Sequence, residues 1–258
     1  MDHTLDGIRD IKLYQNRKGY RFSVDALLLE SFVNLTRAER IADLGAGSGI
    51  IGLLLAKKYH AATVALVELQ ESLVRLAERN IVLNKLEERV RVIRTDIKTL
   101  SFSSEVHKFT SSGTEDFSAS ALLHSFDLIV SNPPFRRIKT GLISAIDEKA
   151  IARHEIKIHL ADLISVAHYL LKSKGRLCLI YHPSRLVELL DTLRKKHMEP
   201  KRLRFVHSNS QTEAKMVLVE AVKEGRAEIK IEKPIYIYKD DMSYTDEMKK
   251  LYERPVIQ

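Results

Sequence analysis

Residues 40–58 read RIADLGAGSGIIGLLLAKK, and this stretch decides the fold. Its first five residues have the apolar pattern of a short strand, and residues 49–58 have the apolar face of a helix. Glycines at 45, 47 and 49 remove side chains where the chain must turn from the strand into the helix. The pattern predicts a strand, a turn and a helix in which backbone N–H groups can approach a ligand closely.

Short apolar strand patterns alternate with amphipathic helix patterns along the rest of the chain. The further predicted strands are 63–69, 90–94, 127–131 and 175–181, and the further predicted helices are 70–84, 159–172 and 184–196. Two late strand candidates, 203–208 and 215–222, are too close together for a crossover helix and predict an antiparallel pair at one edge. We therefore expect a Rossmann-like α/β fold: a mostly parallel seven-stranded sheet with helices on both faces.

The chain has 258 residues, of which 45% are hydrophobic, so one globular unit with appendages accounts for its length. Residues 1–36 are expected to form an N-terminal appendage, with a hairpin over 11–23 that turns at NRKG and a following helix capped by Ser23. Residues 37–258 are expected to form the main domain. The serine-rich segment 101–120 is interpreted as a surface insertion without chemistry.

Composition excludes several classes of protein. The single cysteine, Cys178, lies in an apolar stretch and predicts a core residue, so a disulfide framework is excluded. The charged N-terminus and the lack of an apolar run near the roughly 20 residues that cross a bilayer predict a soluble cytoplasmic protein without a membrane partner. A net charge of +8 is compatible with a polyanionic partner.

The glycine turn is compatible with two cofactors. Residues 47–52 match the dinucleotide pattern G-x-G-x-x-G, and Glu68 at the end of the second strand could hold a ribose in either case. Asp43 argues against a pyrophosphate beside it and suits an ammonium group. Asp96 provides a third acid at the end of a third strand, at the edge where open α/β sheets bind ligands. S-adenosylmethionine has an amino-acid end for Asp43, a ribose for Glu68 and an adenine for Asp96. The predicted cofactor-binding residues here are Asp43, Gly45, Ala46, Gly47, Ser48, Gly49, Glu68, Leu69, Asp96 and Ile97.

A second motif, DLIVSNPPF, occupies residues 127–135. Proline has no backbone N–H and disfavours helical geometry in the residue before it, so the strand must end at Asn132 in a stiff, extended corner.

DLGAGSG followed by SNPPF resembles the class I S-adenosylmethionine-dependent methyltransferases. The tetrad Asn132-Pro133-Pro134-Phe135 is similar to the motif of those members that methylate amino or amide nitrogens. Four further stretches resemble the bacterial tRNA (adenine-N6)-methyltransferase family, which modifies the adenosine beside the anticodon of a valine tRNA. They are 18–29, 152–155, 171–186 and 199–207. The chain departs from the family pattern over 101–125, which is longer, and at Arg136-Arg137.

The resemblance implies methyl transfer to the N6 amine of adenine 37 in a tRNA. An exocyclic amine is a poor nucleophile, and the Asn132 amide oxygen with the Pro133 carbonyl can accept its two hydrogens. Phe135 would stack on a base that is already unpaired. The resemblance also implies that Asn132, Arg21 and Phe22 contact the cofactor, although local helix capping explains Arg21 and Phe22 equally well.

Basic clusters that could follow RNA phosphates come directly after the tetrad and later in the chain. They are Arg136, Arg137 and Lys139, then 194–196, then Lys201, Arg202 and Arg204. The first cluster flanks the expected pocket and is the predicted substrate-binding set, together with Phe135.

His154, Glu155 and His159 do not have the spacing of a zinc motif, so no metal is expected. No obligate protein partner is evident. Within enzymes, the alternative is methylation of a guanine N2 amine in rRNA or of a protein glutamine amide. From other classes, an NAD-binding oxidoreductase or a non-catalytic RNA-binding module stays open.

Overall fold

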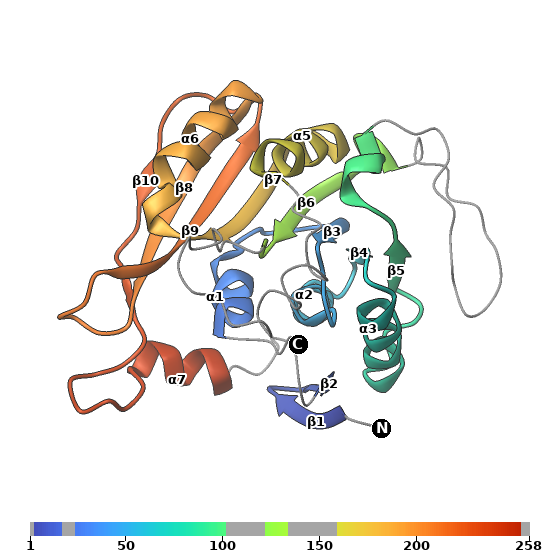
Figure 1. Ribbon diagram of the computed structural model, residues 1–258, viewed down its shortest axis with the longest axis horizontal. Coiled ribbons are helices and arrows are strands. Elements are labelled where there is room, and N and C mark those ends of the chain that lie inside the picture. The colour runs from blue at the N-terminus through green and yellow to red at the C-terminus, as the bar shows by residue number, and fades with distance from the viewer. Residues whose placement is uncertain (1–2, 17–23, 102–121, 134–158, 254–258) are drawn as a thin grey trace, which may run out of the picture.

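A nine-stranded sheet runs through the computed structural model, which describes residues 3–16, 24–101, 122–133 and 159–253 (Figure 1). The strand order is β10-β8-β9-β7-β6-β3-β4-β5, with β11 pairing on β8. The parallel strands are β3 (Arg40–Leu44), β4 (Thr63–Glu68), β5 (Val90–Arg94), β6 (Phe126–Ser131) and β7 (Leu171–Tyr181). The antiparallel pair is β8 (Met198–His207) and β9 (Ala214–Lys223).

Both faces of the sheet are covered because its strands are apolar on both sides. The helices α1 (Val24–Phe32), α2 (Ile50–Lys58), α3 (Glu71–Leu83) and α7 (Asp246–Glu253) contribute to the core on one face. The helices α5 (Leu160–Leu170) and α6 (Leu186–Lys195), with the short helices η1 (Ile97–Ser101) and η3 (Pro183–Arg185), lie on the other. Figure 1 shows these two helical layers on opposite sides of the strands.

Successive side chains along a strand point alternately into the two cores, one on each face of the sheet. In β6, Leu128 and Val130 face the core beneath α1 and α2, whereas Ile129 faces the core beneath α5. Cys178 of β7 is fully buried in the first of these cores, and this burial raises the pKa of its thiol. The prediction that Cys178 is a core residue is therefore confirmed.

The seven predicted strands of the sheet are all present, and the last two form the predicted antiparallel pair. Two strands of two residues each, β10 (Lys230–Ile231) and β11 (Ile235–Tyr236), were not predicted and pair in parallel with β8. They are too short to give an alternating apolar pattern. Helix α7 was also not predicted.

The N-terminal hairpin differs from the prediction. Residues 11–16 form β2 (Ile11–Asn16), but their partner is β1 (His3–Ile8), which precedes them. The turn of this hairpin is made by Arg9 and Asp10, where Arg9 has a left-handed φ of 53°. Residues 17–19 of the predicted NRKG turn lie outside the described residues. Ser23 and the serine-rich insertion from residue 102 lie outside the described residues.

A buried ion-pair network ties the antiparallel edge to the rest of the sheet. Glu220 of β9 is 1% exposed and accepts from Arg176 of β7 at 2.8 Å and from Arg202 of β8 at 2.9 Å. Arg202 also pairs with Glu232 at 2.9 Å, and its guanidinium lies 4.4 Å from the centre of the Phe32 ring. Among the described residues, the two charged partners of the Glu220 carboxylate therefore come from the two strands next to β9.

None of the helices in the described ranges is long and apolar enough to cross a bilayer.

Replacing Glu220 with alanine should lower the free energy of unfolding by about 3 kcal/mol, because it leaves two arginines at the sheet without their buried partner. Asp191→Ala removes an exposed ion pair with Lys195 and is the matched control, with an expected change within about 0.5 kcal/mol. Urea unfolding of both variants measures the difference. Equal losses in the two variants would contradict the role given to the network.

Candidate functional site

The carboxyl ends of four adjacent parallel strands bring the predicted acids and the asparagine to one edge of the sheet. Asp43 of β3 pairs in register with Leu66 of β4 and with Val130 of β6. Glu68 ends β4, Asp96 follows β5, and Asn132 follows β6. The strand pairing therefore brings these four residues to one edge, where open α/β sheets bind their ligands.

The glycine turn, residues 45–49, has a backbone that only glycine adopts readily. Gly45, Gly47 and Gly49 have φ values of 77°, 58° and 88°. The N–H groups of Gly45 and Ala46 both donate to the Val67 carbonyl of β4, at 2.9 and 3.0 Å. A Cβ built on Gly45 would have no atom within 4 Å, so the turn has open space on that side.

Asp43 is a fully buried carboxylate in front of this turn. Its Oδ2 accepts from the Gly52 N–H of helix α2 at 3.0 Å, and its buried Oδ1 has no hydrogen-bond partner among the described residues. The pKa of Asp43 is raised to about 7. Burial is the largest cause; the Gly52 N–H lowers the pKa, and the charge of Glu68 raises it. An unpaired buried oxygen is rare in folded proteins, and it suits a cationic ligand that donates a hydrogen bond.

Glu68 supports the glycine turn directly. Its Oε2 accepts from the Gly47 N–H at 2.9 Å, and its Oε1 accepts from the N–H groups of Leu69 and Gln70 at 2.9 and 2.8 Å. The carboxylate is thus held in one orientation at the edge of the sheet. Its Oε2 still has a lone pair for one hydroxyl donor.

Asp96 and Ser48 complete the polar set. The Asp96 Oδ1 accepts from the Lys98 N–H at 2.9 Å, so this side chain caps the short helix η1, in which Ile97 is the first residue. The Ser48 side chain is 2% exposed and its Oγ has no hydrogen-bond partner among the described residues. Asp43 and Ser48 therefore leave two buried polar atoms without partners, one just before the glycine turn and one within it. This observation fits a bound polar ligand.

The corner after β6 is fixed to the glycine turn by a side chain that the sequence analysis missed. The Ser131 hydroxyl donates to the Leu44 carbonyl at 2.6 Å, which joins the end of β6 to the residue before Gly45. Asn132 follows it and is half-buried, and Pro133 is buried. The other members of the tetrad, the basic cluster after it and the N-terminal cofactor residues lie outside the described residues. They are Pro134, Phe135, Arg136, Arg137, Lys139, Arg21 and Phe22.

Asn80 was also missed. It is fully buried on α3, and its side chain donates to the Ser48 carbonyl at 3.0 Å. A signal was present in the sequence, because Asn80 falls on the apolar face of the helix, beside Leu76, Ala77 and Ile81. A buried amide on such a face must have hydrogen-bond partners.

The later basic clusters are largely neutralised by carboxylates. Arg194 pairs with Glu199 and Lys195 with Asp191, so much of the charge at 194–196 is compensated. Arg202 is used in the Glu220 network. Their interpretation as RNA-binding clusters has less support than their interpretation as ordinary ion-paired surface.

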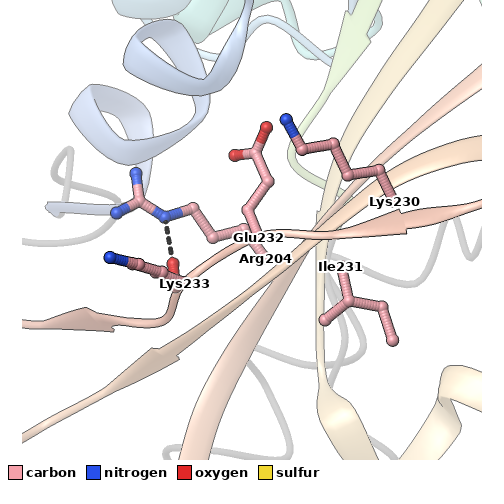
Figure 2. Close-up of a pocket in the computed structure, with 5 residues that line it drawn as sticks. All are labelled: Arg204, Lys230, Ile231, Glu232 and Lys233. Atoms are coloured by element: carbon pink, nitrogen blue, oxygen red, sulfur yellow. Dashed lines mark hydrogen bonds between the residues drawn. The ribbon is translucent and has the colours of Figure 1, made fainter.

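A shallow groove of about 450 Å³ opens at the far end of the sheet, between β8 and β10. Figure 2 shows its lining residues, which are Arg204, Lys230, Ile231, Glu232 and Lys233. Arg204 is held by the Lys233 carbonyl at 2.7 Å and by Glu247 at 2.7 Å. Four strands separate β10 from β3, so the groove is distinct from the site at the glycine turn.

Within the described ranges, no three histidine, cysteine or acidic side chains are grouped as a metal site would require. His159 directly precedes α5, and His154 and Glu155 lie outside those ranges.

Comparison with known proteins identifies the fold. A model of the methyltransferase small domain matches residues 23–109. A solved structure from Agrobacterium tumefaciens, described as a predicted O-methyltransferase, is 25% identical, covers 88% of this chain and 94% of its own, and has a TM-score of 0.65. TYW2 of M. jannaschii, solved in complex with AdoMet, is 15% identical, with 86% and 85% coverage and a TM-score of 0.55. The chain has the fold of the class I methyltransferases.

Curated relatives specify the family. A tRNA1(Val) (adenine(37)-N6)-methyltransferase of Porphyromonas gingivalis is 30% identical over 204 residues, or 78% of this chain and 73% of the relative. One of Dyadobacter fermentans is 27% identical over 167 residues, or 65% and 60%. The chain belongs to the family of tRNA1(Val) (adenine(37)-N6)-methyltransferases. The match spans about 60% of the length of several of these relatives.

Replacing Asp43 with asparagine should stabilise the ligand-free protein above pH 7, because it removes a buried charge. The raised pKa means that the folded state holds the Asp43 proton more strongly than the unfolded state. The wild type therefore loses stability as pH rises from about 4 to about 7. Relative to the variant, the wild type should lose about 2–3 kcal/mol between pH 5 and pH 8 in urea unfolding. A difference that does not change with pH would contradict this assignment.

Proposed function

We propose that this protein transfers a methyl group from S-adenosylmethionine to the N6 amine of adenine 37 in tRNA1(Val). The observation that carries the proposal is the meeting of two sequence motifs at one edge of the sheet. The glycine turn with Asp43 ends β3, and Asn132-Pro133 ends β6, beside it. Family membership supports the proposal, and the names of the curated relatives supply the substrate.

The residues of the glycine turn fit S-adenosylmethionine. The unpaired Oδ1 of Asp43 would accept from the ammonium of its amino-acid end, and Glu68 would accept from a ribose hydroxyl through the free lone pair of Oε2. Asp96 would lie beside the adenine. Leu69 and Ile97 follow these two acids and would border the same ligand. When bound, S-adenosylmethionine supplies an electrophilic methyl group on a sulfonium.

Asn132 and Pro133 would orient the amine that receives the methyl group. The lone pair of an exocyclic adenine amine is delocalised into the ring, and two acceptors placed at its hydrogens favour a pyramidal nitrogen. The Asn132 amide oxygen and the Pro133 carbonyl are those acceptors. A strongly basic side chain is not required, because the nitrogen becomes acidic only after it is methylated.

The proline corner prepares these acceptors before the substrate arrives. Pro133 restricts the backbone, and the Ser131 hydroxyl fixes the end of β6 to Leu44 of β3. Less conformational freedom is then lost when the amine binds, which is a recognised source of rate enhancement.

The tRNA substrate must present an unpaired base, since a paired adenine cannot reach a pocket at the sheet edge. An anticodon-loop adenine meets this requirement. Phe135 would stack on the base, and Arg136, Arg137 and Lys139 would contact phosphates. In this proposal residues 37–258 form the catalytic unit, Arg21 and Phe22 contact the cofactor, and the reaction takes place in the cytoplasm with its tRNA.

Replacing Asn132 with alanine should lower kcat by a factor of about 100 or more, because it removes one of the two acceptors at the reacting nitrogen. The dissociation constant for S-adenosylhomocysteine should change by less than about threefold, since Asp43 and Glu68 hold that ligand. Methyl transfer to tRNA and calorimetry measure the two quantities. Full activity in this variant would exclude the proposed alignment of the amine.

Calorimetry should show that S-adenosylhomocysteine binds and NADH does not. The affinity for S-adenosylhomocysteine should weaken by about tenfold or more from pH 7.5 to pH 5.5, because the protonated form of Asp43 cannot pair with the ligand ammonium. Asp43→Asn should bind weakly at both values. Binding of NADH instead would support an oxidoreductase, and an affinity independent of pH would contradict the role of Asp43.

The target base is tested by mass spectrometry of nucleosides from tRNA of a deletion strain. We expect a loss of N6-methyladenosine that returns when the wild-type chain is expressed and does not return with Asn132→Ala. A loss of methylated guanosine in rRNA or of a methylated protein glutamine would instead support the alternative substrates.

A further inference from the structure

Helix α3 carries two buried asparagines one turn apart, Asn80 and Asn84, which are 0% and 8% exposed. Their side-chain amides bind the backbone of strand β2 in the N-terminal hairpin. Asn84 accepts from the Lys12 N–H at 2.9 Å and donates to the Lys12 carbonyl at 2.7 Å. Asn80 accepts from the Tyr14 N–H at 2.7 Å and donates to the Tyr14 carbonyl at 3.2 Å.

This pairing satisfies the backbone of β2 on the side away from β1. Residues two apart on a strand direct their N–H and C=O groups to the same side, and residues four apart on a helix lie on the same face. Lys12 and Tyr14 therefore match Asn80 and Asn84 in spacing. Two side chains of a helix provide the hydrogen bonds that a third strand would provide.

Asn80 makes one contact that Asn84 does not. Its Nδ2 also donates to the Ser48 carbonyl, at 3.0 Å, inside the glycine turn. The N–H of the same Ser48–Gly49 peptide donates to the Ala46 carbonyl at 2.9 Å. Both the carbonyl and the N–H of this peptide are therefore hydrogen-bonded. The peptide joins Ser48 to the left-handed Gly49 and follows the left-handed Gly47.

We propose that Asn80 is a positioning residue for the cofactor. Its side chain couples the docked N-terminal hairpin to the shape of the glycine turn. The inference rests on the proposed function, because it assigns S-adenosylmethionine to that turn. Without the Asn80 donor, the buried Ser48 carbonyl loses its partner and the peptide can rotate between Gly47 and Gly49. Rotation would displace the Ser48 hydroxyl and the neighbouring N–H groups from the ligand.

The hairpin side of this coupling is also well fixed. The Arg79 guanidinium lies 4.4 Å from the centre of the Tyr14 ring, so both the side chain and the backbone of Tyr14 contact α3. Figure 1 shows the hairpin beside α3 at the same side of the sheet as α2. The position of Asn80 is thus set from the hairpin, and the position of the Ser48 carbonyl is set from Asn80.

The matched pair Asn80→Ala and Asn84→Ala tests the proposal. Both variants lose the pairing of one β2 residue with α3, and both should melt at a lower temperature. Only Asn80→Ala also loses the bond to the glycine turn. Its dissociation constant for S-adenosylhomocysteine should rise about tenfold, and its KM for S-adenosylmethionine should rise equally, with kcat changed by less than about threefold.

Calorimetry is carried out well below the melting temperature of the least stable variant. Asn84→Ala should then bind S-adenosylhomocysteine within about twofold of the wild type. An equal weakening in the two variants would assign the effect to general destabilisation and overturn the proposal. Wild-type affinity in Asn80→Ala would also overturn it.

Asn80→Asp is a second test at the same position, because aspartate can still accept from the Tyr14 N–H but cannot donate to the Ser48 carbonyl. It should bind the ligand at least as weakly as Asn80→Ala, and affinity within twofold of the wild type would overturn the proposal. A wild-type protein that binds no S-adenosylhomocysteine is a different result. It would overturn the proposed function itself, and the inference with it.

Discussion

The site depends on one constraint: a turn with three left-handed glycines in five residues has few regular hydrogen bonds of its own. Its backbone must be held from outside, and the contacts come from several parts of the fold. β4 supplies the Val67 carbonyl and the Glu68 carboxylate, and α3 supplies Asn80. Just before the turn, the Ser131 hydroxyl at the end of β6 donates to the Leu44 carbonyl. The shape of the turn is therefore a property of the whole sheet and not of the local sequence alone.

This support allows the fold to maintain an unfavourable charge. Burial and the nearby charge of Glu68 raise the pKa of Asp43 to about 7, although the hydrogen bond from the Gly52 N–H lowers it. A neutral side chain of similar shape would be better for stability. The carboxylate makes chemical sense as the counter-charge of a cationic ligand, and stability is then recovered when the complex forms. Binding sites commonly contain groups, such as this buried carboxylate, that lower the stability of the ligand-free protein.

Much of the fold could be predicted from the sequence because its strands are apolar on both faces and its helices have one apolar face. The acids at 43, 68 and 96 lie at or just after the carboxyl ends of predicted strands, so their common edge could be inferred without coordinates. The hairpin could not be placed, because residues 11–16 have the same strand pattern whether their partner precedes or follows them. The two-residue strands on β8 form only because β8 offers a free edge, which has no local signal.

The supporting contacts were harder to predict than the acids. Ser131 and Asn80 act on carbonyl oxygens of distant residues, and no spacing in the sequence links Ser131 with Leu44 or Asn80 with Ser48. Asn80 had a local signal as a polar residue on an apolar helix face, but that signal states only that it needs partners. Which partners it has depends on how α3 packs between the hairpin and the glycine turn.

The strand order explains why the two motifs meet at this point of the sheet. From β3 the chain continues outward through β4 to β5, and it then returns to place β6 on the opposite side of β3. Helix α2, which follows β3, packs on one face of the sheet, and α5, the next described helix after β6, packs on the other. Open α/β sheets bind their ligands at the carboxyl ends of strands where the topology switches in this way. The glycine turn follows β3 at this edge, and Asn132 follows β6 beside it. In the proposed reaction, a methyl donor held by the first and an amine held by the second would meet at this edge, because adjacent strands end there side by side.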